Sequence, residues 1–367
     1  MPIPTLADLP PPPPGKTGFP WTEECPRLND PGLPRVSIVT PSFNQGAYLE
    51  ETLRSVLLQG YPNLEYIVMD GGSADQSVEI IRRYAPWLAS WVSEPDRGQV
   101  DAIAKGWARS SGAILAYLNS DDTYLPNAIA NAVNALTTYP AAVAICGGEL
   151  LINAQGIVIA ERFVQSATLD DLLHFKFVPQ PSIFLRRETF LRAGGLDSSF
   201  QVVFDFELWT RVVQLGAMQC IPQTLGTTRW HTSAKSFTQR LRVLAELERV
   251  IQKIFSSAIG ARFSARERRA LAARLHLLAV GIHFDTMPHS IRQVIAHSIA
   301  GLRDSLSIAP ELIRVIAYRA RVLTVYYWRK YAQHQAIEKL PWGFGYTGIR
   351  WNIWHQREQG RDNARRD

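Results

Sequence analysis

The chain has 367 residues, of which 46% are hydrophobic and 20% are charged. This length and composition are typical of a globular protein with one large or two ordinary domains, and they exclude a disordered or collagen-like chain. No stretch reaches the roughly 18 uninterrupted apolar residues that a membrane-spanning helix needs. Cys25, Cys146 and Cys220 form no C-x-x-C pair, which argues against a disulfide framework and against a zinc site.

Charge is unevenly distributed along the chain. From Arg240 to the end, 22 Lys and Arg stand against 10 Asp and Glu, whereas residues 1–239 hold 17 and 23. A basic C-terminal region favours contact with an anionic membrane surface, and no nucleic-acid-binding module is recognisable, so nucleic acid is not expected as a partner. Because a proline run occupies residues 10–14, where a signal peptide needs an apolar core, we expect a cytoplasmic protein, peripheral at the inner face of the membrane.

The N-terminal half predicts alternating strands and helices. Residues 1–32 are rich in proline and predict a flexible arm, after which residues 35–40 predict a strand that Pro41 ends. Apolar residues at helical spacing follow in 49–57, and the pattern repeats with a strand at 64–69 and a helix up to Tyr84. A third unit has a strand from Ser90, a helix after Gly98 and a last strand at 113–118. Such alternation predicts a right-handed parallel α/β sheet.

The pattern changes beyond Pro126. Strand-like segments at 142–146, 157–164 and 181–185 are separated by loops and by a helix that ends at 193–195. We interpret this part as a mixed, acceptor-facing half of one catalytic domain, residues 33–238. Residues 239–367 are expected to form a basic, helical region. Its alternative roles are to cover the catalytic domain, to dimerise, to clamp the acceptor or to lie on anionic lipid.

Three predicted strands end in polar residues, at 40–44, 70–75 and 119–122. The carboxyl ends of parallel strands line one crevice, so these groups are expected to converge there. Asp121 and Asp122 repel one another, and a bound cation would balance them; the alternative is that one of them caps the helix predicted after Leu125. Asp70 precedes two glycines, and it can accept hydrogen bonds from a nucleoside or close an Asx-type turn.

These motifs together resemble a known family. Residues 34–44, 68–75, 94–106 and 118–122 are similar to family 2 glycosyltransferases with the GT-A fold, of the non-processive type that builds bacterial polysaccharides and glycolipids. The resemblance covers about residues 34–237. It implies a mixed, mainly parallel sheet flanked by helices, and transfer of one sugar, with inversion, from a nucleotide-diphosphate sugar, UDP-sugar being favoured. The implied acceptor is a saccharide or a lipid-linked saccharide, and the implied cofactor is Mn²⁺ or Mg²⁺.

The resemblance also assigns residues to the donor and to the cation. The donor nucleotide is expected to contact Thr40, Pro41, Phe43, Asn44, Asp70, Gly71, Ser73, Asp96, Gln99, Asn119 and Ser120. Asp121 stands at the metal-binding position of the D-x-D motif, with Asp122 and His231 as further candidates. Asn119 replaces the first carboxylate of that motif and is expected to contact ribose. Gln180, Arg229 and Lys235 are expected near the phosphates or the acceptor.

Transfer to a hydroxyl also needs a general base. Residues 200–209 resemble the stretch that carries this base in the family, and Asp205 takes its position, while Phe204 replaces the first acid of the usual pair. Glu207 is the fallback, although an exposed helical charge is the favoured interpretation of that residue.

The sequence bears on three other functions. Because Asn119 and Phe204 each replace an acid, a nucleotide-sugar binding or scaffolding protein without catalysis stays open. A nucleotide-binding oxidoreductase is disfavoured because no G-x-G-x-x-G follows the first strand. A processive synthase is disfavoured because residues 239–243 lack the Trp of the Q-x-x-R-W signature.

Overall fold

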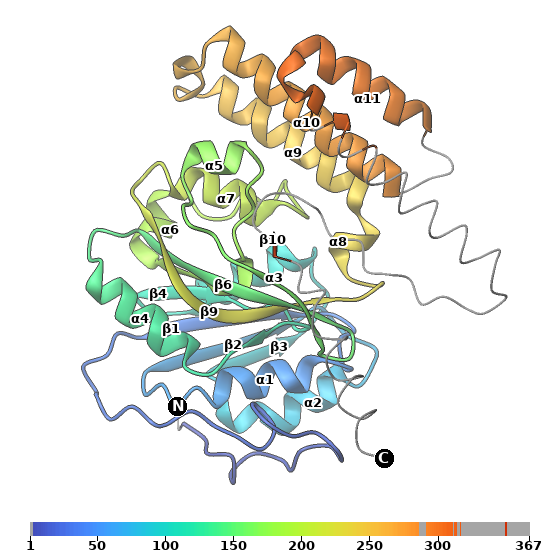
Figure 1. Cartoon of the computed structure of the whole chain (residues 1–367). Coiled ribbons are helices and arrows are strands. Elements are labelled where there is room, and N and C mark those ends of the chain that lie inside the picture. Colours follow the sequence, from blue (N-terminus) through green and yellow to red (C-terminus); the bar gives the residue numbers. More distant parts are fainter. Residues whose placement is uncertain (1–2, 286–290, 311, 314–315, 317–348, 351–367) are drawn as a thin grey trace, which may run out of the picture. The chain divides into compact units, whose positions relative to one another are not determined.

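The computed structural model describes residues 3–285, 291–310, 312–313, 316 and 349–350. These residues form two compact units (Figure 1). The first contains residues 3–172, 176–231 and 349–350, and the second contains residues 173–175 and the described residues between 232 and 316. Each unit is described by itself below.

Strands and helices alternate in the first half of the first unit, as the sequence predicts. The strands are β1 (Val36–Ser42), β2 (Leu64–Asp70), β3 (Ser90–Ser93) and β4 (Ile114–Tyr117), and β1 pairs in parallel with both β2 and β4. The helices are α1 (Leu49–Leu57), α2 (Ser77–Tyr84) and α3 (Gln99–Arg109). Strand β1 runs through Pro41, contrary to the prediction, because its pairing with β4 ends at Val39 and no β4 residue needs the missing N–H.

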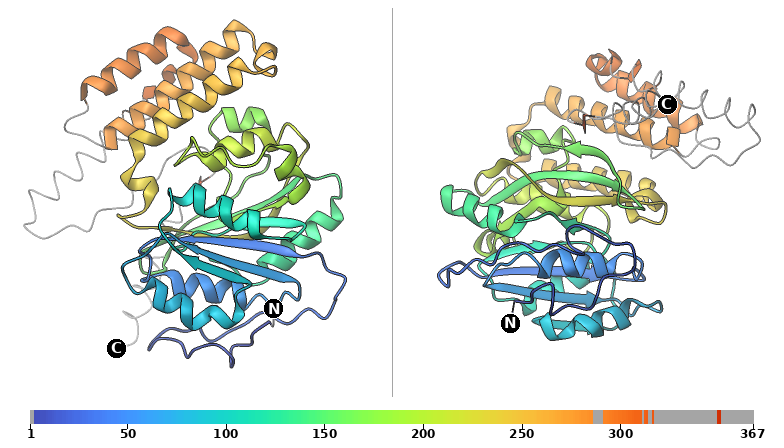
Figure 2. Two further views of the ribbon diagram at one scale, coloured as in Figure 1. Left: turned by 180° about the vertical axis from the view of Figure 1, so that it is seen from behind. Right: turned by 60° about the horizontal axis from the view of Figure 1, so that its bottom comes forward.

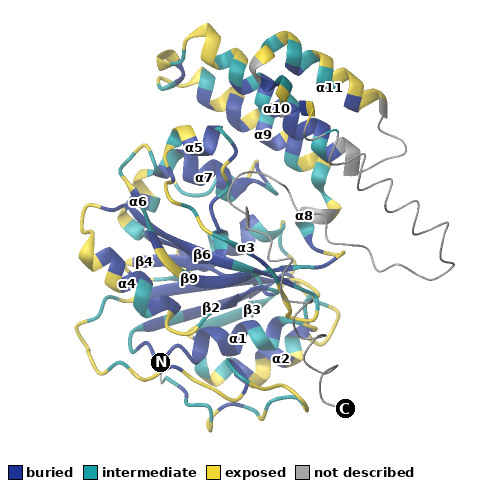
Figure 3. Cartoon of the chain, viewed as in Figure 1, coloured by how far each residue is buried: buried dark blue, intermediate teal, exposed yellow. Residues whose placement is uncertain are grey.

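The two faces of this sheet are covered by different helices. One core contains apolar side chains of α1, α2 and α4 (Ala128–Thr138), packed on alternate sheet residues such as Val36, Ile38 and Val68. Helix α3 lies on the other face, where a Cβ added to Gly106 would come within 2.6 Å of Val39 Cγ1. Figure 3 shows the strands as a buried layer between these helices. A side chain of β1 or β4 therefore faces either the α1 core or α3, according to its parity in the strand.

The second half of the sheet is mixed. Strand β4 pairs antiparallel with β8 (Ile183–Arg186), and the sheet continues through β6 (Ala144–Asn153), β7 (Val158–Arg162) and β10 (Ile349–Arg350). The long strand β9 (Met218–Trp230) pairs with β6 and with the short β5 (Thr123–Tyr124). The sequence does not predict β9, because Pro222 and Gly226, which are typical of turns, interrupt this segment. Three short helices complete the unit: α5 (Leu169–Leu173), α6 (Arg187–Arg192) and α7 (Phe204–Val212).

The proline-rich N-terminal segment packs on α1, in place of the expected flexible arm. Leu9 and Trp21 are buried, and the fully buried guanidinium of Arg54 donates to the backbone carbonyls of Pro10, Pro20 and Trp21. Figure 2 shows the segment as a dark blue trace beside α1. The composition of this segment indicates that it cannot form a core of its own. Composition does not show, however, that the backbone carbonyls of the segment accept hydrogen bonds from a buried arginine of α1.

The second unit is helical in its described part. It contains α8 (Lys235–Thr238), α9 (Arg240–Ser256), α10 (Ala265–Asp285) and α11 (Ile291–Asp304). Ala273, Leu277 and Val280 of α10 form a small core with Val294 of α11 and Ile308. Within the described residues, no helix has both the length and the apolar character to cross a membrane. The rest of the region predicted to be helical lies outside the described residues.

Candidate active site

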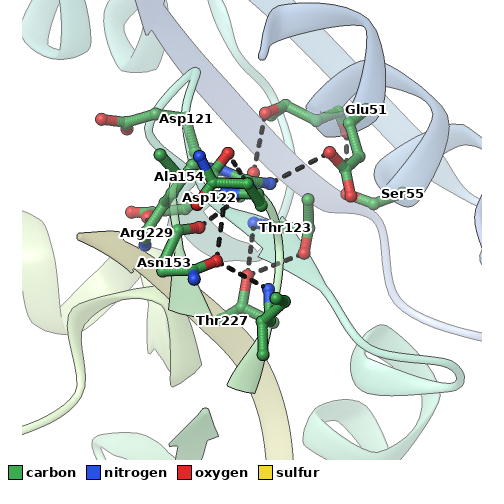
Figure 4. Close-up of polar contacts among 12 residues, drawn as sticks. Glu51, Ser55, Asp121, Asp122, Thr123, Asn153, Ala154, Thr227 and Arg229 are labelled. Atoms are coloured by element: carbon green, nitrogen blue, oxygen red, sulfur yellow. Dashed lines mark hydrogen bonds and ion pairs between the residues drawn. The ribbon is translucent and has the colours of Figure 1, made fainter. Parts of the chain in front are cut away.

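The acidic segment after β4 is anchored by β9 (Figure 4). Asp122 is buried, and its Oδ1 accepts a hydrogen bond from the Arg229 backbone N–H at 2.9 Å. Its Oδ2 accepts from Asn119 Nδ2 at 3.0 Å. Burial, and then the charge of Asp121, raise the pKa of Asp122 well above its ordinary value. Neither carboxylate caps α4, whose N-cap residue is Asn127.

Arg229 stabilises this segment from the inside. Its side chain is only 2% exposed; Nε donates to the Asp121 carbonyl at 2.9 Å, and Nη2 pairs with Glu51 of α1 at 3.0 Å. The guanidinium also lies over the Tyr48 ring, 4.8 Å from its centroid. The predicted contact of Arg229 with phosphate is therefore wrong for this structure, because burial and these partners keep the guanidinium inside the protein.

Asp121 and His231 form a pair beside this segment. His231 Nε2 lies 2.9 Å from Asp121 Oδ2, and the His231 ring packs against Tyr48 with centroids 5.0 Å apart. A carboxylate and an imidazole at this separation can both bind one divalent cation, provided that the imidazole nitrogen is deprotonated. Among the described residues, no cluster of three or more His, Cys, Asp or Glu is arranged for a metal ion. The pair therefore fits a cation whose other ligands come from substrate or water.

A chain of side-chain amides extends from the acidic segment to two other elements. Gln99, the first residue of α3, donates from Nε2 to Asn119 Oδ1 at 2.6 Å. Asn119 Nδ2 also donates to Gln180 Oε1 at 3.2 Å, and Gln180 Nε2 donates to the Tyr117 carbonyl at 2.8 Å. The structure thus brings together Gln99, Asn119 and Gln180. Asn119 keeps acceptor capacity on Oδ1 for its predicted ribose contact.

Asp205 lies in the first turn of α7 and is partly buried. The Tyr117 hydroxyl is hydrogen-bonded to the Asp205 carboxylate, and burial together with the charges of Asp205 and Asp122 raises the pKa of Tyr117. Glu207 is only 1% exposed and pairs with Arg211 at 2.6 Å, so its interpretation as an exposed charge is wrong. This ion pair holds Glu207 in place, which also removes it as the fallback base.

The loops after β1 and β2 are joined by side-chain hydrogen bonds. Asp70 is buried and accepts from the backbone N–H groups of Gly72 and Ser73 and from the hydroxyls of Ser73 and Ser93. This is the Asx-type turn that was the alternative role for Asp70, and only Oδ1 keeps acceptor capacity for a nucleotide. Asn44 accepts from the Ala74 N–H at 2.9 Å, and its own N–H donates to the Ser73 hydroxyl.

Two predicted donor contacts of β1 differ from the structure. Thr40 is fully buried and bonded to the Tyr66 hydroxyl at 2.9 Å, because its parity directs it toward the core under α1 and not toward the crevice. Pro41 is buried in β1, where it pairs with Met69. Phe43, just beyond the strand, is 61% exposed. The nucleotide contact predicted for Phe43 stays a prediction, and the Phe43 side chain is accessible to a ligand.

The remaining predicted residues are distributed as follows. Gly71 lies against Asp96, since a Cβ on Gly71 would be 2.9 Å from Asp96 Oδ2. Ser120 is 4% exposed, and Lys235 begins α8 in the second unit. The sequence does not indicate a role for Glu51 or for Tyr117. Glu51 resembles any charged residue of a helix, and Tyr117 lies in the apolar run of a predicted strand. No sequence pattern distinguishes either.

Sequence comparison with known proteins decides the family. Residues 37–150 match the family model described as glycosyl transferase family 2. An uncharacterized glycosyltransferase of Mycobacterium tuberculosis is 33% identical over 194 residues, which cover 52% of this chain and 72% of that protein. The chain belongs to glycosyltransferase family 2. This glycosyltransferase is also 24% identical over 235 residues to the putative teichuronic acid biosynthesis glycosyltransferase TuaG of Bacillus subtilis, covering 59% of this chain and 90% of TuaG.

Solved structures share the fold of this glycosyltransferase. The crystal structure of Staphylococcus aureus TarS 1-349 aligns with a TM-score of 0.52 at 14% identity, covering 83% of this chain and 94% of that one. The chain spans 53% of the longer TarS structure that it also matches. The Pyrobaculum calidifontis mannosyltransferase PcManGT, in complex with GDP-Man and Mn²⁺, aligns with a TM-score of 0.51 at 20% identity, covering 84% and 86%. These likenesses confirm the GT-A fold expected from the sequence motifs.

Proposed function

We propose that this glycosyltransferase moves a single sugar from a nucleotide-diphosphate sugar to a saccharide or lipid-linked acceptor, with inversion at the anomeric carbon. The observation that carries the proposal is the acidic segment after β4: Asp121 Oδ2 lies 2.9 Å from His231 Nε2, and the hydroxyl of Tyr117, the last residue of β4, is hydrogen-bonded to the Asp205 carboxylate. A base and a pair of acidic residues after a sheet strand are the groups that this displacement needs.

Asp205 acts as the general base in this proposal. It takes the proton of the acceptor hydroxyl while that oxygen bonds to the anomeric carbon, and the bond to the diphosphate breaks with both electrons on the leaving oxygen. A single displacement of this kind inverts the anomeric centre. Glu207 cannot replace Asp205, because Arg211 binds it from two nitrogens at 2.8 and 2.6 Å.

Asp121 and His231 would hold the divalent cation. When bound, Mn²⁺ or Mg²⁺ stabilises the negative charge that grows on the departing diphosphate. Asp122 would help to position Asp121. Its two carboxylate oxygens accept hydrogen bonds inside the protein, one from the Arg229 backbone N–H and one from Asn119 Nδ2. An imidazole nitrogen in the pair favours Mn²⁺, because Mg²⁺ prefers a shell of oxygen ligands.

A UDP-sugar is the favoured donor. A TarS structure in complex with UDP-GlcNAc aligns with a TM-score of 0.50, and PcManGT was solved with GDP-Man, which supports a nucleotide-diphosphate sugar as the donor class. The exposed Phe43 ring, next to the joined loops of Asn44 and Ser73, offers a flat apolar surface for the nucleobase. Gln99 and Asn119 lie on the ribose side in this arrangement.

The acceptor is proposed to be at the inner face of the cytoplasmic membrane, in polysaccharide or glycolipid synthesis for the cell envelope. The relation to TuaG, whose name refers to teichuronic acid biosynthesis, supports a saccharide acceptor. Helix α11 exposes Ile295 and Ile299, one turn apart, together with Arg292 and Arg303. Exposed apolar residues bordered by arginine are typical of helices that lie in the membrane interface.

Purified full-length protein incubated with UDP-, GDP-, dTDP- and CMP-sugars and Mn²⁺ or Mg²⁺ tests the proposal. We expect consumption of one donor, loss of activity with chelator, and a reduction of about 10³-fold in kcat for Asp205→Asn with nucleotide binding retained by calorimetry. The matched control is Glu188→Gln, an 80% exposed carboxylate that should leave activity unchanged. Turnover by Asp205→Asn close to that of the parent protein would reject Asp205 as the base.

A second candidate function has specific support. Asn119 and Phe204 each stand where the family usually has an acid, which favours a nucleotide-sugar binding protein without catalysis. The same experiment separates the two candidates. Metal-dependent nucleotide binding without turnover of any donor would replace the enzymatic proposal with this one.

A further inference from the structure

Tyr117 occupies a buried position between the base and the acidic segment. It is the last residue of β4, with 3% of its surface exposed. Its ring lies 5.9 Å from the Trp107 ring of α3, edge to face, and 5.9 Å from the Phe204 ring at the start of α7. Two packed aromatic neighbours leave the ring little freedom to turn.

The Tyr117 hydroxyl is the donor in its bond to Asp205. Burial, and then the charges of Asp205 and Asp122, raise the pKa of Tyr117 well above its ordinary value. The phenol therefore stays protonated at neutral pH, and a carboxylate can only accept. A hydrogen bond to an ionised acceptor is roughly twice as strong as a neutral one.

The backbone of Tyr117 serves the other side of the site. Its carbonyl accepts from Gln180 Nε2 at 2.8 Å, and Gln180 Oε1 accepts from Asn119 Nδ2, which also donates to Asp122. Through its hydroxyl and its carbonyl, one residue contacts both the proposed base and the amide chain that holds the acidic segment.

We propose that Tyr117 is a positioning residue that fixes the Asp205 carboxylate relative to the donor site, and this inference rests on the proposed function of Asp205. Proton transfer requires the base within hydrogen-bond reach of the acceptor hydroxyl. Within α7, the Phe206 backbone N–H donates to Asp205 Oδ1 at 2.7 Å. The Tyr117 phenol adds a donor from outside the helix, and the two donors together set the orientation of the carboxylate. A displacement of about 1 Å at such a group costs on the order of 10²-fold in rate.

Tyr117→Phe tests the proposal, because it removes the hydroxyl and keeps the packed ring. We expect kcat to fall by about 10- to 100-fold while KM for the donor changes by less than about twofold. The matched control is Tyr124→Phe: Tyr124 is equally buried, and its hydroxyl has no hydrogen-bond partner among the described residues. This variant should keep the parental kcat. An unchanged kcat for Tyr117→Phe, or a fall equalled by Tyr124→Phe, would overturn the inference.

The double variant separates this inference from the base assignment. If Asp205→Asn abolishes most activity, adding Tyr117→Phe should not lower the residual kcat further, because the hydroxyl acts through Asp205; additive losses would contradict it. If Asp205→Asn keeps its activity, the proposed function of Asp205 fails instead. If Tyr117→Phe does not fold, 3-fluorotyrosine at position 117 keeps the hydroxyl and should retain kcat within about threefold, and a loss beyond 10-fold would count against positioning by this bond.

Discussion

At the scale of single residues, the Asn119 amide donates hydrogen bonds that a carboxylate at this position could not donate. Asn119 donates from Nδ2 to Asp122 Oδ2 at 3.0 Å and to Gln180 Oε1 at 3.2 Å. A carboxylate in its place would only accept, so it would face the buried Asp122 and leave Gln180 Oε1 without this donor. Asn119, which replaces the first carboxylate of the usual D-x-D motif, is therefore matched to its two neighbouring acceptors, Asp122 and Gln180.

Asn119→Asp should destabilise the protein. We expect a loss of about 1–3 kcal/mol in the free energy of unfolding at pH 7, from the lost hydrogen bonds and the new repulsion. Urea denaturation in the presence of chelator measures it without compensation by a bound cation. Asn134→Asp, which adds the same charge at an exposed position on α4, should change stability by less than about 0.5 kcal/mol. A variant Asn119→Asp as stable as the parent would show that Asp122 does not need the amide.

At the scale of elements, the start of α3 determines where Gln99 lies. Asp101 accepts from the Arg97 backbone N–H at 3.1 Å and from its guanidinium at 2.8 Å, and it pairs with Lys105 at 2.9 Å. The bonds to Arg97 and then Lys105 hold the pKa of Asp101 well below its ordinary value. These bonds fix the turn from which Gln99 reaches Asn119.

Asp101→Asn should therefore weaken the protein at neutral pH and flatten its response to acid. A carboxyl whose pKa is lower in the folded state contributes stability above its unfolded value, near 3.9, and this contribution is lost as the pH falls through the folded value. We expect a loss of about 1–2 kcal/mol at pH 7, moderated by the 83% exposure of Arg97, and a smaller difference from the parent at pH 3.

Urea denaturation between pH 3 and pH 7 checks this expectation. Glu79→Gln, an exposed carboxylate on α2, is the control and should leave the unfolding free energy and its pH dependence nearly unchanged. A difference between Asp101→Asn and the parent that stays constant from pH 7 to pH 3 would mean that the ionised carboxylate is not what stabilises this turn.

The elements were more predictable from sequence than the contacts between them. Periodicity alone located α1, α2, α3 and the strands between them, because each buries one face and local spacing records it. The same pattern could not show that Thr40 faces the core, that Arg229 is buried against Glu51, or that Tyr117 meets Asp205. Those facts depend on pairings such as β9 with β6, between residues far apart in sequence. Family motifs identified the acidic segment, but packing decides which of its groups remain accessible.

At the scale of the whole molecule, charge and exposed apolar surface coincide in the C-terminal region. This region carries 22 of the 39 Lys and Arg residues. Within its described part, Ile295 is 53% and Ile299 is 63% exposed on α11, which also exposes Arg292 and Arg303. In the proposed membrane contact, these arginines attract the helix to anionic headgroups over about a Debye length, and the isoleucines retain it at the interface.

The full-length protein should therefore float with vesicles that contain phosphatidylserine and much less with vesicles of phosphatidylcholine alone, and added salt should weaken the binding. Ile299→Ser should reduce the partition coefficient about 5- to 13-fold, since about 1–1.5 kcal/mol of apolar burial is lost. Leu191→Ser is a matched control, because Leu191 is 64% exposed on α6 in the other unit. Equal losses for the two variants would mean that general hydrophobicity drives the binding. Binding without salt dependence would instead exclude the arginines as its cause. Either result would contradict the prediction that the basic C-terminal region binds anionic membranes.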